Sequence, residues 1–194
     1  MSDGEPTAKT GPVTEPPLLT RLRERFPEAV IATHAYRGDA TAEIAPATLL
    51  DVCTFLRDDP ESAFDFLADV TAVDYIGTAP RFELVYHLRS IARGQRVRLK
   101  TRVSEESPRV ASLTSVWRGA NWLERETYDM YGIVFDGHPD LRRIYLYEEF
   151  QGHPLRKDYP KEKRQPLVTQ RDVAPEQAER TEAREQQRYG RWPD

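Results

Sequence analysis

Cysteine is nearly absent from this chain of 194 residues, which contains one thiol, Cys53. A single cysteine forms no disulfide within the chain and cannot supply the four thiolates that normally hold an iron–sulfur cluster. Cys53 falls within the apolar residues 49–56, and we interpret it as a small core side chain. If the chain is part of a redox enzyme, we expect the electrons to travel through other subunits.

Long apolar runs are missing as well. No segment approaches the roughly 18 consecutive apolar residues of a membrane-spanning helix. The N-terminus resembles neither a secretory signal nor an arginine-rich mitochondrial transit peptide. The net charge of −4 argues against a nucleic acid or an anionic membrane surface as the partner. We therefore expect a cytosolic and bacterial protein, with one domain of ordinary size and tails.

Composition predicts three parts. Residues 1–17 are rich in proline, threonine and glycine, have almost nothing to bury, and are expected to be disordered. Residues 18–150 are expected to form one domain. Residues 151–194 combine many charges with few large apolar side chains, so we expect an extended C-terminal tail that is disordered or becomes ordered on a partner subunit.

Apolar periodicity predicts the elements of the domain. Helices are expected at residues 18–26, 47–57 and 114–131, and strands at residues 30–36, 41–44, 81–88 and 95–103. Residues 64–75 are ambiguous. The last strand alternates buried-type residues (Val97, Leu99, Thr101, Val103) with cations that we interpret as a solvated face (Arg96, Arg98, Lys100, Arg102). The pattern predicts an α+β fold with a mixed, mainly antiparallel sheet backed by helices.

The predicted helix 114–131 has two contrasting faces. One is an apolar stripe (Val116, Ala120, Leu123, Thr127, Met130), and the other carries charges and a tryptophan (Arg118, Trp122, Arg125, Glu126, Asp129). Arg125 and Asp129 are four residues apart, and an intrahelical pair there would add only about 0.2–0.5 kcal/mol. Tryptophan and arginine are enriched at interface hot spots. The residues alone leave a solvated charged face and a protein interface equally open.

Two catalytic readings are weaker. Glu124, Glu126 and Asp129 could act as acid and base, but arginines lie nearby and no nucleophile accompanies them. His138 and His153 each stand between glycine and proline, which is typical of tight turns whose imidazole bonds to backbone or carboxylate. Metal ligands usually lie closer in sequence or come with cysteines. We expect no catalytic and no metal-binding residues in this chain.

Residues 121–159, NWLERETYDMYGIVFDGHPDLRRIYLYEEFQGHPLRKDY, carry the strongest signal. They contain Glu124-Arg125-Glu126, then Asp129-Met130-Tyr131, then His138, Arg142, Ile144 and Tyr145. This ordering resembles the signature of the 30 kDa (C-type) subunit family of respiratory complex I, the proton-pumping NADH:quinone oxidoreductase. With this resemblance, we favour the interface interpretation of the helix face.

The resemblance implies a structural, non-catalytic subunit of the hydrophilic arm of complex I, in electron transport and proton translocation. It implies a peripheral position on the cytoplasmic side of the bacterial inner (plasma) membrane, touching the membrane only through the complex. FMN, iron–sulfur clusters, NADH and a quinone would be bound in other subunits, and none by this chain. The implied partners are the 49 kDa (D-type) subunit, which this chain would brace near the quinone site, and subunits B and I.

Interface and signature residues carried over from the resemblance are Trp122, Glu124, Arg125, Glu126, Asp129, His138, Arg142, His153, Arg156, Lys157 and Tyr159. Residues 153–160 hold two prolines and are expected to be an extended strip with anchors at Leu155 and Tyr159, similar to the start of the family's C-terminal extension on the 49 kDa subunit.

Three alternatives stay open. The first is the equivalent subunit of a membrane-bound hydrogenase or of a ferredoxin- or F420-dependent complex. The second is a free-standing metal-dependent enzyme that uses His138 and His153. The third is a nucleic-acid binder that uses the cations of strand 95–103, although the acidic balance and the lack of aromatic residues on that strand speak against it.

Overall fold

The computed structural model describes residues 15–167, so the expectations for residues 1–14 and 168–194 lie outside the described part. The elements are α1 (Pro17–Arg25), β1 (Val30–Tyr36), β2 (Asp39–Ile44), the short 3₁₀ helix η1 (Pro46–Thr48), α2 (Leu49–Asp58), β3 (Phe66–Asp74), β4 (Phe82–Ser90), β5 (Gln95–Val103), β6 (Arg109–Ala111), α3 (Ala120–Tyr131) and β7 (Val134–Asp136).

Five strands form one twisted sheet in the order β1-β2-β5-β4-β3. Only the β2–β5 pair is parallel, and the other neighbours run antiparallel. β6 and β7 form a separate parallel pair. The predicted α+β class, with a mixed and mainly antiparallel sheet, is confirmed.

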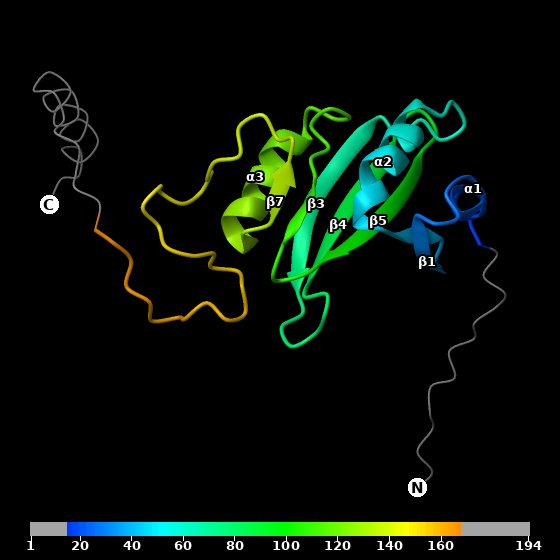
Figure 1. The fold of residues 1–194 in the computed structure, drawn as a ribbon. Helices are drawn as coiled ribbons and strands as arrows, with labels where there is room; N and C mark the ends of the chain where they lie inside the picture. Colours follow the sequence, from blue (N-terminus) through cyan, green and yellow to red (C-terminus); the bar gives the residue numbers. More distant parts are fainter. Residues whose placement is uncertain (1–14, 168–194) are drawn as a thin grey trace, which may run out of the picture. The chain divides into compact units, whose positions relative to one another are not determined.

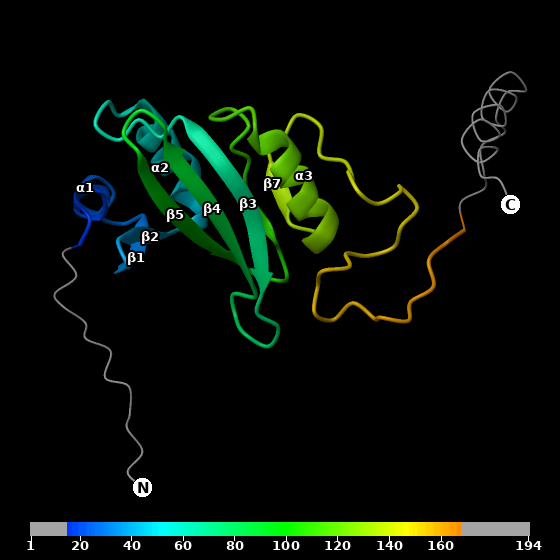
Figure 2. The ribbon, with the colours of Figure 1, turned by 180° about the vertical axis from the view of Figure 1, so that it is seen from behind.

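The helices cover one face of the sheet. Alternate residues along the central strands point to this face, as the buried side chains of Leu84, Tyr86, Leu99 and Thr101 show. They join side chains of α1, α2 and α3 in a single hydrophobic core. Figure 1 shows α2 in front of the strands, and Figure 2, from behind, shows β3, β4 and β5 with no helix before them.

Most predicted elements are confirmed within a few residues, and β1 and β5 have the predicted bounds. The ambiguous residues 64–75 contain β3. The predicted start of the last helix at residue 114 is wrong, because α3 begins at Ala120. Trp117 explains the difference: its indole N–H donates to the carbonyl of Phe64 at 3.0 Å, and this anchor holds residues 114–119 as turns before the helix starts.

Candidate functional site

Arg125 points from α3 toward the segment that follows β7. Its Nε and Nη2 donate to the carbonyls of Arg142 and Arg143, both at 3.1 Å. The same guanidinium lies 5.3 Å from the ring centroid of Trp122, which is within cation–π distance. The intrahelical pair with Asp129 that the spacing allowed is not formed, because Arg125 is engaged by two backbone carbonyls of a distant loop.

Asp129 holds the same loop through its carboxylate, which is fully buried. Oδ2 accepts the backbone N–H groups of Ile144, Tyr145 and Leu146 at 3.0, 2.9 and 3.0 Å, and Oδ1 accepts Nη1 of Arg143 at 2.7 Å. Burial raises the pKa of Asp129, but these hydrogen bonds outweigh it and leave the pKa below its ordinary value. Our placement of Arg125 and Asp129 on an outward face is corrected accordingly, since both point into the domain.

Arg143, which is not among the residues carried over from the resemblance, is the charged partner of Asp129. Besides Asp129, its guanidinium donates to the carbonyls of Phe150 and Gly152, both at 3.0 Å. Its neighbour Arg142, which we had selected, is exposed and pairs with Asp140 at 3.0 Å. Two adjacent arginines look alike in sequence, and only the direction of each side chain distinguishes them.

The two histidines fasten turns to α3, as their glycine and proline neighbours predicted. Nε2 of His138 lies 3.1 Å from the carbonyl of Asn121, and Nδ1 of His153 lies 2.9 Å from the carbonyl of Asp129. Burial lowers the pKa of His153, which favours its neutral form. Among the described residues, no group of three or more His, Cys, Asp and Glu side chains is arranged to hold a metal ion.

Residues 153–160 were expected to be an extended strip, and this is wrong. Turns close them, with the N–H of Arg156 on the carbonyl of His153 at 3.2 Å and the N–H of Tyr159 on that of Arg156 at 3.0 Å. The N–H of Leu155 donates to Met130 O at 3.1 Å, so the segment folds onto the end of α3. Pro154 and Pro160 restrict the backbone dihedral angles of this segment, but this restriction is also compatible with turns.

A second cluster, not anticipated from the sequence, joins this segment to the sheet. Arg81 is 3% exposed; it donates to both carboxylate oxygens of Asp74 at 2.7 Å and to Asp158 at 2.8 Å, and it also pairs with Glu105. The bonds from Arg81 lower the pKa of Asp158 to about 2 and hold that of Asp74 below its usual value. The N–H of Lys157 donates to Asp74 at 2.7 Å. These residues lie up to 84 positions apart (Asp74 to Asp158), so no local spacing indicated the cluster.

Glu124 faces the core. It follows Ala120 by four residues and precedes Thr127 by three, so the helical stripe itself could have indicated its burial. The Ser112 hydroxyl donates to Oε2 at 2.6 Å and the Leu113 N–H to Oε1 at 2.7 Å. Burial raises the pKa of Glu124 to about 7, because these two bonds compensate only part of the lost hydration.

An exposed patch remains outside these internal contacts. Trp122 is 63% exposed and Tyr145 is 66% exposed, and the Tyr145 hydroxyl lies 3.4 Å from a carboxylate oxygen of Glu126. Arg125 links the two aromatic residues, since it lies under Trp122 and bonds the loop that carries Tyr145. We call Trp122, Glu126, Arg142 and Tyr145 the α3 patch. Large exposed aromatic side chains on a rigidly held support are typical of protein–protein contact surfaces.

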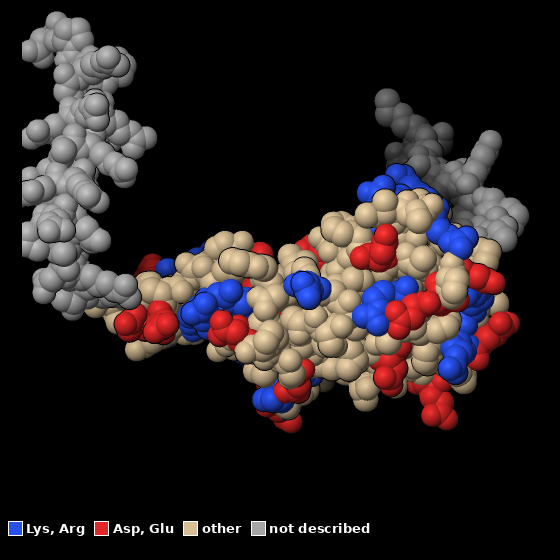
Figure 3. Space-filling model, turned by 90° about the horizontal axis from the view of Figure 1, so that it is seen from above, with Lys and Arg blue, Asp and Glu red and all other residues tan. Residues whose placement is uncertain are grey.

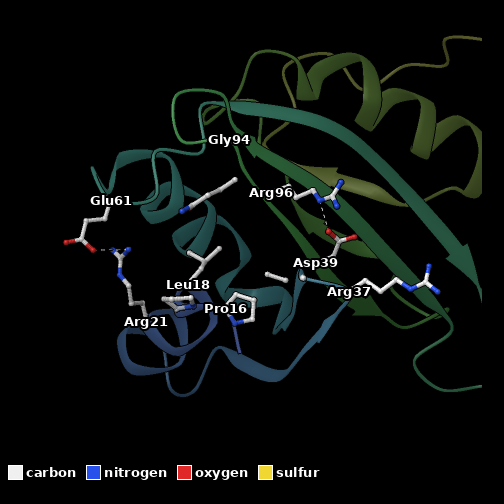
Figure 4. A pocket seen from close by; sticks show the side chains of 12 residues that line it. Pro16, Leu18, Arg21, Arg37, Asp39, Glu61, Gly94 and Arg96 are labelled. Atoms are coloured by element: carbon white, nitrogen blue, oxygen red, sulfur yellow. Dashed lines mark ion pairs between the residues drawn. The ribbon is translucent and has the colours of Figure 1, made fainter. Parts of the chain in front are cut away.

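A pocket of about 380 Å³ lies elsewhere, between the start of α1 and the turns of the β1–β2 and β4–β5 hairpins. Ion pairs lie within it, Arg21 with Glu61 at 3.0 Å and Arg96 with Asp39 at 2.6 Å (Figure 4). Figure 3 shows acidic and basic side chains interspersed on the face seen from above, with no continuous region of one sign.

Comparison with known proteins gives consistent matches. Residues 42–165 match the family described as respiratory-chain NADH dehydrogenase, 30 kDa subunit. The C-type subunit of NADH-quinone oxidoreductase from Roseiflexus castenholzii is 52% identical over 145 residues, which cover 75% of this chain and 83% of the relative. The corresponding C-type subunit from Citrifermentans bemidjiense is 46% identical over 142 residues, 73% of this chain and 87% of the relative.

Two solved structures are similar to this chain in fold. A trypsin-resistant fragment (1–134) of Nqo5 superposes with a TM-score of 0.56 at 32% identity, covering 63% of this chain and 98% of the fragment. A chain of the archaeal membrane-bound sulfane sulfur reductase superposes with a TM-score of 0.63 at 22% identity, covering 92% of this chain and 94% of that chain, and shows the same fold. No helix within residues 15–167 has the length and apolar character needed to cross a membrane.

Proposed function

This chain belongs to the respiratory-chain NADH dehydrogenase 30 kDa subunit family, and from that premise we propose that it is a structural subunit of the peripheral arm of an NADH:quinone oxidoreductase. Its role is to brace the 49 kDa (D-type) subunit near the quinone site. Subunits B and I are further neighbours under this proposal. The complex lies at the inner membrane of a bacterium, on the cytoplasmic side, and this chain reaches the membrane only through the other subunits.

The observation that supports this role is the way α3 presents the α3 patch. Arg125 and Asp129 are used internally, to bond the backbone of residues 142–146. The loop is therefore fixed, and Tyr145 is held outward beside Trp122. A preorganised surface loses less conformational entropy when a partner binds. The signature residues thus divide into buried ones that hold the loop and exposed ones that meet the partner.

Catalysis lies with other subunits in this proposal, as do FMN, the iron–sulfur clusters, NADH and the quinone. The buried charged groups of this chain support a structural role, because each has a partner within the domain: Asp129 bonds Arg143, and Arg81 bonds Asp74. We propose NADH as the electron donor of the complex, since the curated relatives are named as C-type subunits of NADH-quinone oxidoreductase.

The test is co-purification with the 49 kDa-type subunit encoded by the same organism. Truncation of a hot-spot aromatic residue costs about 2 kcal/mol or more, so Trp122→Ala should weaken the association roughly thirtyfold. Ile76→Ala is the matched control, because Ile76 is also exposed but lies in the β3–β4 turn. The melting temperature of the isolated Trp122→Ala chain should change little. Unchanged recovery of the partner, together with a large loss of stability, would show that Trp122 serves the fold and would contradict the proposal.

A further inference from the structure

The uncovered face of the sheet carries like charges at the β4–β5 hairpin end. Arg89 lies directly opposite Arg96 in the β4–β5 register, and Arg98 follows Arg96 by two residues on the same face. Side chains opposite one another in an antiparallel pair are close, and like charges there destabilise the sheet. The like-charged pair across these strands therefore does not stabilise the isolated domain.

Two carboxylates on this face, Asp39 and Glu83, pair with cations other than Arg89 and Arg98. Asp39 pairs with Arg96 at 2.6 Å, while Glu83, at the far end of β4, pairs with Lys100 at 2.8 Å and with Arg102 at 3.0 Å. Within residues 15–167, neither Arg89 nor Arg98 makes an ion pair with a carboxylate. The far end of the face is therefore balanced, and the hairpin end has two arginines without a partner.

Exposed aromatic side chains flank these arginines. Phe66 of β3 lies opposite Arg89 and is 47% exposed, and Tyr36 of β1 lies opposite Asp39 and is 67% exposed. A hollow of about 280 Å³ lies on this face, and its lining includes His87, Arg89 and Arg98. Figure 4 shows Arg96 turned toward Asp39. The carboxylate of Asp39 is therefore already paired with Arg96. Arginine and aromatic residues beside a hollow are the composition of a protein contact surface.

We propose that this surface, the sheet-end site (Tyr36, Phe66, His87, Arg89 and Arg98), docks an acidic segment of another protein subunit. Two carboxylates of that segment would pair with Arg89 and Arg98 and relieve the repulsion across the strands. A nucleic acid fits less well, because the whole chain carries a net charge of −4, whereas a short acidic segment needs only these two arginines. The inference rests on the proposed function in one respect: the acidic segment is taken to belong to another subunit of the same complex.

The sheet-end site and the α3 patch are on different sides of the sheet. α3 packs on the covered face, where the Thr127 hydroxyl donates to the carbonyl of Val70 at 3.2 Å. Arg89 and Arg98 alternate with core residues along β4 and β5, so they point away from the helices. With both surfaces occupied, the chain links two neighbours and does not simply cap one.

The first arm of the experiment separates binding from folding. In the double variant Arg89→Glu and Arg98→Glu, each new carboxylate stands opposite a basic side chain, so the isolated chain should melt no lower than the wild type. In the assembled complex, recovery of the docked subunit should fall about tenfold or more, since close charge pairs across an interface are lost. Lys161→Glu is the control: Lys161 is exposed, makes no ion pair within the described residues, and belongs neither to the sheet-end site nor to the α3 patch.

The second arm identifies the docked segment. A photo-crosslinking amino acid replaces Arg98 in the complex, and the crosslinked peptide is sequenced by mass spectrometry. A peptide of another subunit with two or more Asp or Glu residues supports the proposal. A crosslink to a nucleic acid, to lipid, to a second copy of this chain or to a segment without carboxylates overturns the proposal. The absence of a crosslink, or a double variant that melts at a lower temperature than the wild type, also overturns it.

The two proposals can fail separately. If the sheet-end site fails while Trp122→Ala still weakens co-purification, the proposed function stands. If Trp122→Ala has no effect on co-purification, the proposed function fails by itself.

Discussion

Arg143 Nη1 lies 2.7 Å from Oδ1 of Asp129, so that a loop without helix or strand is joined to α3 by a buried charge pair. The other oxygen of Asp129 accepts three consecutive backbone N–H groups. One carboxylate thereby satisfies four donors, and the loop needs no secondary structure of its own. Stability of the domain and presentation of the α3 patch should both depend on this side chain.

Asp129→Asn should destabilise the domain strongly. The amide keeps one acceptor oxygen, removes the charge that compensates Arg143, and turns two donors toward backbone N–H groups. Breaking a buried pair in this way costs about 3–5 kcal/mol, which urea denaturation would measure. Glu126→Gln is the control and should change the free energy of unfolding by less than about 1 kcal/mol, because Glu126 is partly exposed on the same helix. Equal effects for the two variants would contradict the prediction.

Glu124→Gln should stabilise the domain above pH 7 and have little effect near pH 4. Burial raises the pKa of Glu124 from 4.5 to about 7, so the folded state prefers the neutral form. The stability linked to that proton is fully present below the unfolded pKa of 4.5 and is lost as pH rises toward 7. Above pH 7 the ionised carboxylate costs about 3 kcal/mol, a penalty that the neutral amide avoids.

Denaturation of wild type and Glu124→Gln across pH 4 to 9 would test this prediction. The difference in free energy of unfolding should grow between about pH 4.5 and 7 and then stay constant. Glu126→Gln again serves as the control, and no comparable rise is expected for it. A Glu124→Gln variant that is less stable at pH 8 would show that the carboxylate is held as an anion.

Asp158→Asn should loosen residues 153–159 without unfolding the domain. The change removes a pair with Arg81, whose hydrogen bonds lower the pKa of Asp158 to about 2. Because Asp158 is partly exposed, solvent screening limits the cost to about 1 kcal/mol, which corresponds to a roughly fivefold larger open population. Trypsin cleavage after Arg156 and Lys157 should accelerate by that factor.

Asp140→Asn is the matched control for this measurement, since Asp140 pairs with Arg142 on the surface and is not part of the cluster. The linkage has a definite sign: the contribution of Asp158 is present above its ordinary pKa of 3.8 and is lost as pH falls toward about 2. Cleavage rates that do not differ between the two variants would mean that Asp158 does not hold the segment.

Gly132→Ala should destabilise more than Gly38→Ala, although both glycines have a positive φ, +78° and +86°. A Cβ at Gly38 meets nothing within 4 Å, so that variant reports backbone strain alone, about 1 kcal/mol. A Cβ at Gly132 would lie 2.6 Å from the ring of His153, which is hydrogen-bonded to Asp129 O.

The free-energy cost of the contact between a Cβ at position 132 and the His153 ring can be measured with a double-mutant cycle. Combining Gly132→Ala with His153→Ala should cost less than the sum of the two single changes, because residues in contact are not additive. Chemical denaturation of the three variants gives the coupling free energy. Full additivity would show that the His153 ring moves aside without cost.

Sequence periodicity was sufficient to predict a helix or strand wherever one face of the element is buried and the other is exposed. Val97 to Val103 in β5 alternate strictly, and the strand has the predicted bounds. The predicted end of the last helix at residue 131 is confirmed, and Gly132 follows it in the left-handed conformation. The family signature in residues 121–159 likewise identified the family correctly.

Local sequence, by itself, determined the α+β class, most of the helices and strands and the family, because apolar spacing and turn residues act within a few positions of one another. Only the tertiary structure decided which way each charged side chain points. Arg125 and Asp129 stand four residues apart and could have paired, yet one bonds loop carbonyls and the other bonds loop N–H groups. Arg81 gathers carboxylates from residues 74, 105 and 158. Such contacts satisfy buried polar groups across long sequence separations, and no local pattern encodes which partner will be near.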